Sequence, residues 1–76
     1  MTGTTTRQRL AENIRRLRRA RGLTQEQLGN EARVYQPLIS EIENGVANPE
    51  LDTLDRIAAA LRVDPSELLA RSEGQG

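Results

Sequence analysis

The chain has 76 residues, no net charge, no cysteine and no histidine, which allows one small domain and excludes much chemistry. Disulfide bonds, thiolate nucleophiles, the commonest metal ligand and the usual general base are all missing, so we expect no enzyme, no metal site and no cofactor. No apolar run reaches the roughly 18 residues that a membrane span needs, and the start lacks a signal-peptide pattern, so we expect a cytoplasmic protein without a membrane partner.

The zero net charge hides an uneven distribution along the chain. Residues 1–33 carry eight arginines and three glutamates, which gives this part a charge of +5. Residues 34–76 carry three arginines and eight acidic residues, which gives −5. Such a chain can present a basic face to a polyanion, or both parts can be solvated helix faces. The charge pattern alone leaves both interpretations open.

The apolar residues follow helical spacing throughout, and no segment alternates as a strand does. A first helix is predicted to begin in the threonine cluster at 4–6 and to end near Gly22. The threonine and glutamine at positions 24 and 27 form a capping-box pattern, which predicts a short helix over residues 25–32. Another short helix is expected over residues 36–44, with Pro37 in its first turn, where a missing N–H does no harm.

Two proline signals predict the remaining helices. The Asn-Pro pair at 48–49 is typical of an N-cap and first helical residue, and the Asp-Pro pair at 64–65 opens a last short helix. We therefore expect an all-α fold of five helices over residues 6–71, with flexible segments at 1–5 and 72–76. The residues expected in its core are Leu10, Ile14, Leu17, Leu28, Ala32, Ile39, Ile42, Leu54, Ile57, Ala58 and Leu61.

The helices over residues 25–32 and 36–44 are joined by only three residues, which forces the sharp angle of a helix-turn-helix. In the second helix, Ile39 and Ile42 point to one side, into the core. Such a helix can lie in a major groove with its polar side toward the base edges, or it can be an ordinary exposed helix. The residues on the polar side are Gln36, Pro37, Ser40, Glu41 and Asn44.

Several segments, in their order and spacing, resemble the Cro and lambda-repressor-like helix-turn-helix family over roughly residues 8–70. The resemblance implies the compact five-helix lambda-repressor-like domain, with the helix-turn-helix at about residues 25–44. It also implies a sequence-specific transcriptional regulator of bacteria or phages that binds a palindromic operator in double-stranded DNA as a homodimer. The matching segments are GLTQEQL at 22–28, ISEIENG at 39–45, NP at 48–49, LDTL at 51–54 and IAAALRV at 57–63.

The resemblance also assigns residues that would contact DNA. Gln36 matches a position that commonly reads adenine through its amide, and Glu41 one that can accept a hydrogen bond from cytosine N4. Pro37 stands where the family commonly has a polar reader. The expected base contacts are Gln36, Pro37, Ser40 and Glu41, and the expected phosphate contacts are Gln25, Asn44, the backbone at Val46, and Arg18.

Arg18 and Glu43 match a family ion pair that joins the first helix to the recognition helix. Two positions of the turn depart from the family pattern. Arg33 replaces the usual glycine, so we expect a reshaped turn or a left-handed residue at a cost of about 1 kcal/mol. Tyr35 has no short oxygen to cap the recognition helix. These departures keep an alternative open: an antitoxin-like or co-regulator module of the same fold that binds a protein, with weak or no DNA binding.

A dimer contact is expected at the C-terminal end, because the chain offers no second domain to hold two copies together. Leu68 and Leu69 are adjacent on the last predicted helix, so they cannot both face the same core site. One of them is expected to remain for a partner chain. The alternative is that the first helix covers both.

Overall fold

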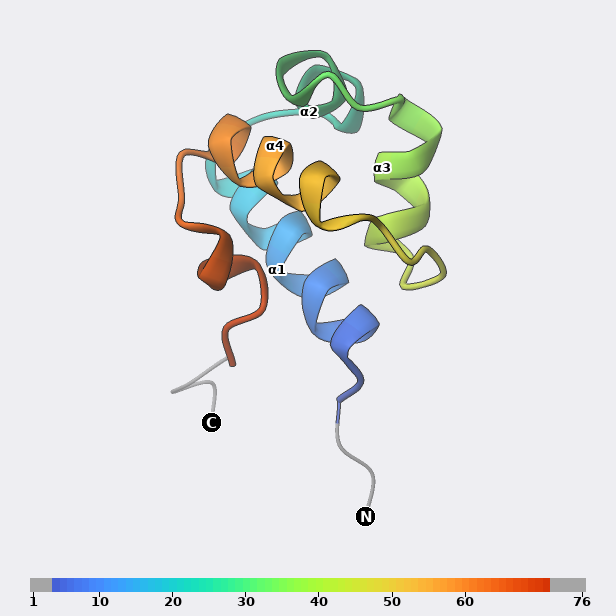
Figure 1. Ribbon diagram of the computed structural model, residues 1–76. Helices are drawn as coiled ribbons and strands as arrows, with labels where there is room; N and C mark the ends of the chain where they lie inside the picture. Colours follow the sequence, from blue (N-terminus) through green and yellow to red (C-terminus); the bar gives the residue numbers. More distant parts are fainter. Residues whose placement is uncertain (1–3, 72–76) are drawn as a thin grey trace.

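The computed structural model describes residues 4–71, which form four α-helices and one short 3-10 helix without any strand in that range (Figure 1). The expected tail at 72–76 and the first three residues of the expected flexible start lie outside the described residues. The all-α fold is confirmed, with four α-helices where five helices were expected. The elements are α1 (Thr6–Ala20), α2 (Gln25–Ala32), α3 (Gln36–Glu43), α4 (Leu51–Leu61) and η1 (Pro65–Leu68).

Both α1 and α2 begin with a capping box. The Thr24 hydroxyl accepts a hydrogen bond from the Gln27 N–H at 3.0 Å, and the Gln27 side chain accepts one from the Thr24 N–H at 2.9 Å. Thr5 and Gln8 repeat this arrangement at the start of α1. Each box satisfies two backbone donors that would otherwise lack a partner at a helix start. Thr5, assigned above to a flexible segment, is therefore held in place.

The predicted start of α4 and the predicted type of the last helix need correction. Residues 46–50 have no regular structure, so Asn48 does not cap α4 and Glu50 holds the cap position with an extended backbone. The first turn forms there because the Leu54 N–H donates to the Glu50 carbonyl at 3.1 Å. The last element is a 3-10 helix, a form that suits a piece of only four residues. Its predicted cap is confirmed, since the Asp64 carboxylate accepts a hydrogen bond from the Ser66 N–H at 2.8 Å.

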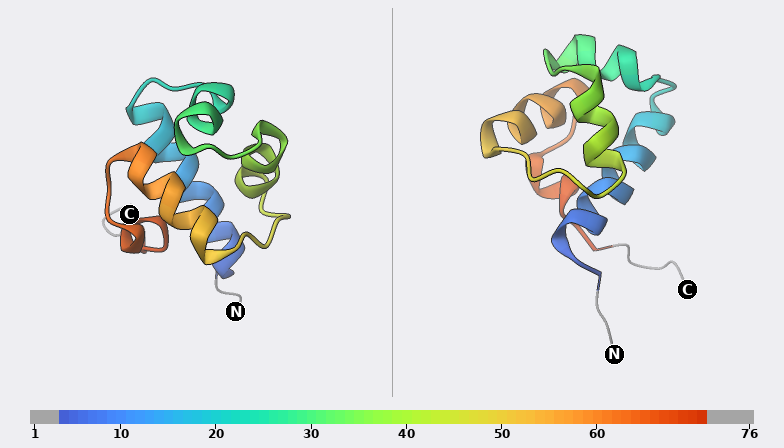
Figure 2. Two further views of the ribbon diagram at one scale, coloured as in Figure 1. Left: turned by 45° about the horizontal axis from the view of Figure 1, so that its top comes forward. Right: turned by 90° about the vertical axis from the view of Figure 1, so that its right-hand side faces the viewer.

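One core joins all the elements, with α3 packed against α1 and α2, and α4 against α2 and η1 (Figure 2). Nine of the eleven residues predicted for this core are buried. The other two, Leu17 and Leu54, are partly buried against it. Leu51 begins the apolar repeat of α4 but is 79% exposed, because the helix starts there and turns this side chain outward.

The C-terminal segment docks on α1 through a buried asparagine. The Asn13 amide donates to the backbone carbonyls of Leu68 and Ala70, both at 2.9 Å. Leu68 is fully buried beside it, within its own domain. The dimer contact expected from Leu68 is therefore wrong, since its side chain already fills a core site. Leu69 is 40% exposed and remains open to a partner.

Candidate nucleic-acid interface

The turn between α2 and α3 is built on a left-handed residue and a close backbone approach. Arg33 adopts φ 59° and ψ 45°, the left-handed alternative expected for this position. The next residue, Val34, is buried, and its N–H donates to the Gly29 carbonyl at 2.9 Å. A Cβ atom on Gly29 would lie 2.7 Å from the Val34 carbonyl oxygen. The sharp angle of the motif therefore requires a residue without a side chain at position 29.

Helix α3 has one buried side and one open side. Ile39 and Ile42 are buried in the core, as predicted. The right-hand view of Figure 2 shows α3 across the face that is turned to the viewer. Of the expected base-contacting residues, Pro37 and Glu41 are exposed, and Gln36 and Ser40 are partly exposed. All four expected base contacts therefore reach the surface.

The predicted ion pair between Arg18 and Glu43 is confirmed. The Arg18 Nε donates to Glu43 Oε2 at 2.6 Å, and the Arg18 Nη2 donates to Oε1 at 3.0 Å. The Glu43 side chain is only 2% exposed and that of Arg18 only 11%. The Arg18 Nη1 also donates to the Leu23 carbonyl at 2.7 Å. This geometry gives Arg18 a positioning role. Little of its guanidinium group is exposed for the expected phosphate contact.

A second arginine of α1 reaches the same glutamate. The Arg15 Nη2 donates to the Glu43 backbone carbonyl, and the Arg15 Nε lies 4.0 Å from Oε1. No role was predicted for Arg15 from the sequence, although its spacing of three from Arg18 places both on one side of α1. The two arginines thus fix the end of α3 against α1.

Glu43 is charged at neutral pH in spite of its burial. Burial raises the pKa of its carboxyl, but the hydrogen bonds from Arg18 and Gln25 and the charges of Arg18 and Arg15 outweigh this effect and lower the pKa below its usual value. The hydrogen bond to Glu43 also raises the pKa of Arg18. The pair therefore stays ionised throughout the physiological range.

The glutamate is also linked to the open side of α3 through two glutamines. The Gln25 Nε2 donates to Glu43 Oε1 at 3.1 Å, and the Gln36 Nε2 donates to Gln25 Oε1 at 3.1 Å. Both glutamines were expected to contact DNA, and the contact between them was not predicted. A single chain of hydrogen bonds therefore runs from Arg18 in α1 through Glu43 and Gln25 to Gln36.

The corner after α3 holds two of the residues expected to contact phosphates, Asn44 and Val46. Asn44 is exposed at the C-cap, where its side chain can reach a phosphate. The Val46 N–H, expected to meet a phosphate, instead donates to the Glu41 carbonyl at 3.1 Å. The phosphate contact expected from the Val46 backbone is therefore wrong, because its N–H already donates to a carbonyl in the last turn of α3.

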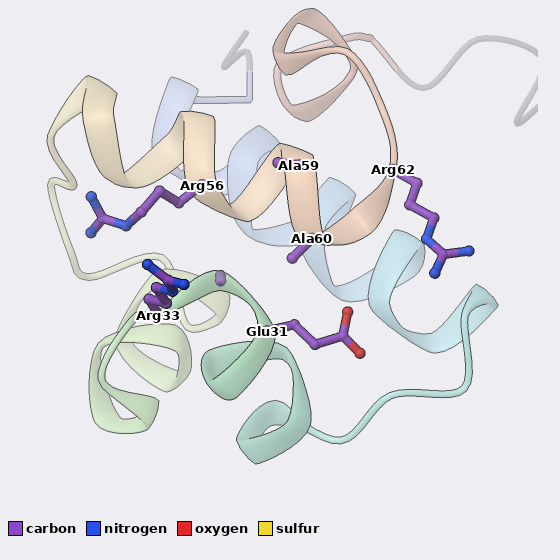
Figure 3. Close-up of a pocket in the computed structure, with 7 residues that line it drawn as sticks. Glu31, Arg33, Arg56, Ala59, Ala60 and Arg62 are labelled. Atoms are coloured by element: carbon purple, nitrogen blue, oxygen red, sulfur yellow. The ribbon is translucent and has the colours of Figure 1, made fainter.

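Apart from the helix-turn-helix, the surface has a hollow between the C-terminal ends of α2 and α4 (Figure 3). Figure 3 shows Arg33 and Arg56 together at one side of this hollow and Arg62 at the other. Its glutamate, Glu31, pairs with Arg21 at 3.1 Å. The remaining charged side chains of the lining are those three arginines, whose guanidinium groups stay protonated. Within residues 4–71, no three acidic side chains gather closely enough to hold a metal ion. No helix in that range has the length and apolar character to cross a membrane.

The comparisons with known proteins point to one family. The HTH_3 family model, described as a helix-turn-helix, matches residues 14–68. The regulator DdrOP3 of Deinococcus deserti is 34% identical over 90% of this chain, which spans only about half (53%) of that protein. The control protein C.BamHI of Bacillus amyloliquefaciens is 36% identical over 76% of this chain and 73% of its own length.

A solved structure shows the same fold. The crystal structure of the hypothetical transcription factor NHTF from Neisseria superposes with a TM-score of 0.88, at 30% identity over 91% of this chain and 79% of that one. The family model covers the described helix-turn-helix and all residues of the core except Leu10. The chain belongs to the HTH_3 family of helix-turn-helix proteins.

Proposed function

We propose that this chain is a sequence-specific DNA-binding regulator of transcription in which α3 enters the major groove. The observation that carries the proposal is the open side of α3, where Gln36 is partly exposed and its amide donates a hydrogen bond to Gln25. A helix presented in this way can bring donors and acceptors to base edges. The relatives above, named as a transcriptional regulator and a control protein, support the same function. A regulator that works on bacterial or phage DNA would act in the cytoplasm.

The proposed contacts follow the geometry of the motif. Bases are read by the open side of α3, and phosphates are bound beside it at Gln25 and Asn44. Gln25 is the first residue of α2, where backbone N–H groups also favour an anion. The exposed Glu41 repels phosphates, so its place is at the cytosine amino group rather than at the backbone. The residues proposed to contact bases are Gln36, Pro37, Ser40 and Glu41.

We infer further that two copies bind one operator. A single recognition helix reads few base pairs, and a two-fold dimer places two such helices in successive major grooves about 34 Å apart. The exposed Leu51 and Leu69 border a small apolar hollow with Pro49, and a second copy of the chain would cover this surface. Removal of these leucines from water supports association. The patch is small, so the dimer is weak and is strengthened by DNA.

Selection of bound fragments from random DNA tests the proposed function. We expect recovery of one palindromic sequence whose affinity falls steeply with salt, because the phosphate contacts release counterions. Sedimentation on that sequence is expected to give two chains per operator. Recovery of unrelated fragments, or binding that is insensitive to salt, would contradict DNA recognition. One chain per full operator at saturation would contradict the dimer.

A second candidate, a module that binds a protein, is favoured by the absence of Lys and Arg from the loop at 45–49 and by the zero net charge. A basic side chain in this loop would add attraction to phosphates, and this chain has none there. Failure to retain any DNA fragment at low salt would leave this second candidate as the better account.

A further inference from the structure

We propose that the hollow between the C-terminal ends of α2 and α4 is a binding site for a small molecule with two or more phosphate groups. The three arginines of its lining, Arg33, Arg56 and Arg62, hold these groups. None of the residues that line the hollow belongs to α3 or is among the proposed DNA contacts. The site is therefore separate from the proposed DNA interface, and its first test needs no DNA.

The hollow carries more positive than negative charge. Its one acidic side chain, Glu31, is paired with Arg21 at 3.1 Å. The side chains of Arg33 and Arg62 form no ion pair or hydrogen bond within residues 4–71. The C-terminal ends of α2 and α4 each add about half a negative charge, which is less than these two guanidinium groups supply. The hollow therefore attracts anions.

Both unpaired arginines occupy positions that favour glycine. Arg33 ends α2 with φ 59° and Arg62 ends α4 with φ 63°, and within residues 4–71 no other residue except glycine has a positive φ. A Cβ atom lowers stability at such a position, and glycine would avoid this loss. Strain of this kind is concentrated where a side chain serves a function. At both positions the side chain that is kept is a guanidinium group at the same hollow (Figure 3).

The grouping of the arginines indicates a phosphate rather than a carboxylate. Arg33 and Arg56 lie together at one side of the hollow (Figure 3). A phosphate has three acceptor oxygens and up to about two charges, so it can meet both guanidinium groups, whereas a carboxylate has two oxygens and one charge. Arg56 already donates to Asp52 at 2.8 Å, but its Nε is buried without an acceptor. This side chain therefore has donor capacity left for an anion.

The opposite side of the hollow provides a place for a second phosphate. Arg62 lies there, and Ala59 and Ala60 lie between it and the other arginines (Figure 3). Their small side chains leave room for the part of the ligand that joins its phosphates. The volume of the hollow, about 550 Å³, is within the range of small-molecule sites. A ligand bound in this way joins the ends of α2 and α4 and stabilises the folded chain.

Titration of the chain with inorganic pyrophosphate and with tripolyphosphate tests the site. At about 0.15 M salt, where unspecific attraction is screened, we expect one ion per chain, bound at least about tenfold more tightly than orthophosphate. Arg33→Gly and Arg62→Gly should each weaken this binding by about tenfold, because each removes a charge-assisted contact. Glycine also relieves the strain, so both variants should resist urea at least as well as the wild type. The control Arg19→Ala removes an exposed arginine outside the lining and should keep the affinity.

The other outcomes overturn the inference in distinct ways. No saturable binding of either polyphosphate, or equal losses in Arg19→Ala and Arg62→Gly, would leave only general charge attraction. Tighter binding of hexaglutamate than of both polyphosphates would assign the hollow to carboxylates of a protein. An equal loss of affinity for scrambled DNA in Arg33→Gly and Arg62→Gly would assign it to the DNA backbone. None of the titrations involves α3, so failure of the polyphosphate site leaves the proposed function intact.

Discussion

Arg18 and Glu43 join α1 to the end of α3 by two hydrogen bonds, of 2.6 and 3.0 Å, in a place that water hardly reaches. Such a pair gains from a low local dielectric but depends on both partners, because a single buried charge is costly. The Glu43 carboxylate also accepts a hydrogen bond from Gln25, and its backbone carbonyl accepts one from Arg15. The pair therefore fixes the position of α3 along its axis and its rotation about that axis, relative to α1.

Replacement of Glu43 by alanine should destabilise the fold by about 3 kcal/mol, because it leaves Arg18 shielded and without its charge partner. The matched control is Asp52→Ala, which breaks an ion pair on the surface. In that pair the Arg56 side chain is 40% exposed and the Asp52 side chain 80% exposed. That loss should stay below about 1 kcal/mol. Urea unfolding of the two variants measures both values. Equal midpoints for the two variants would show that the buried pair contributes no more than a surface pair.

Acid should weaken the fold through the same glutamate. Its folded-state pKa is lowered, so Glu43 contributes stability that is fully present above its unfolded pKa of about 4.3 and is lost as the pH falls through the folded value. We therefore expect the free energy of unfolding to decline on acidification below that pH. In Glu43→Gln this decline should be shallower, with the remainder due to other carboxylates such as Asp64, whose pKa the Ser66 hydrogen bonds lower. Parallel pH profiles for both chains would contradict the assignment.

Gly29→Ala should destabilise the fold by about 2 kcal/mol, although alanine is the better helix former by about 1 kcal/mol. The new Cβ atom would lie 2.7 Å from the Val34 carbonyl oxygen, which belongs to the backbone and cannot rotate away. Asn30→Ala, at an exposed position of the same helix, serves as the control and should be neutral or slightly stabilising. Thermal unfolding decides the point, and a Gly29→Ala chain at least as stable as the wild type would show that the turn can widen.

Arg33→Gly should stabilise the fold by up to about 1 kcal/mol, because glycine adopts the left-handed conformation without a clash of its Cβ atom. Arg33→Ala removes the same charge but keeps the Cβ atom, so it should bring no such gain. Comparison of the two variants by urea unfolding isolates the backbone effect. Equal stability of the glycine and alanine chains would mean that the strain at this position is negligible.

Much of the fold could be predicted because its signals are local. The capping box at Thr24 and the polar and apolar sides of α3 each depend on neighbouring residues. The left-handed conformation of Arg33 was one of two alternatives that the family pattern left open. The ion pair of Arg18 and Glu43 was predicted only because a family resemblance supplied the contact between distant residues.

The parts that could not be predicted depend on how helices cross. Gln25 contacts both Gln36 and Glu43 because of the angle between α2 and α3, which no spacing within one helix encodes. Leu68 and Leu69 are equivalent in sequence, and only the docking of the last segment by Asn13 shows which one is buried. Local proline signals likewise did not reveal that α4 starts at Leu51.

The most direct test of the account is the affinity of Gln36→Ala for the selected operator and for a scrambled duplex of the same length, both measured at the same salt concentration. Base contacts specify and phosphate contacts position, so the loss should fall on the operator alone. We expect roughly a tenfold weaker complex with the operator, within the range of a lost bidentate contact, and an unchanged complex with scrambled DNA. Equal losses on both duplexes, or no loss on either, would contradict the claim that α3 reads bases through Gln36.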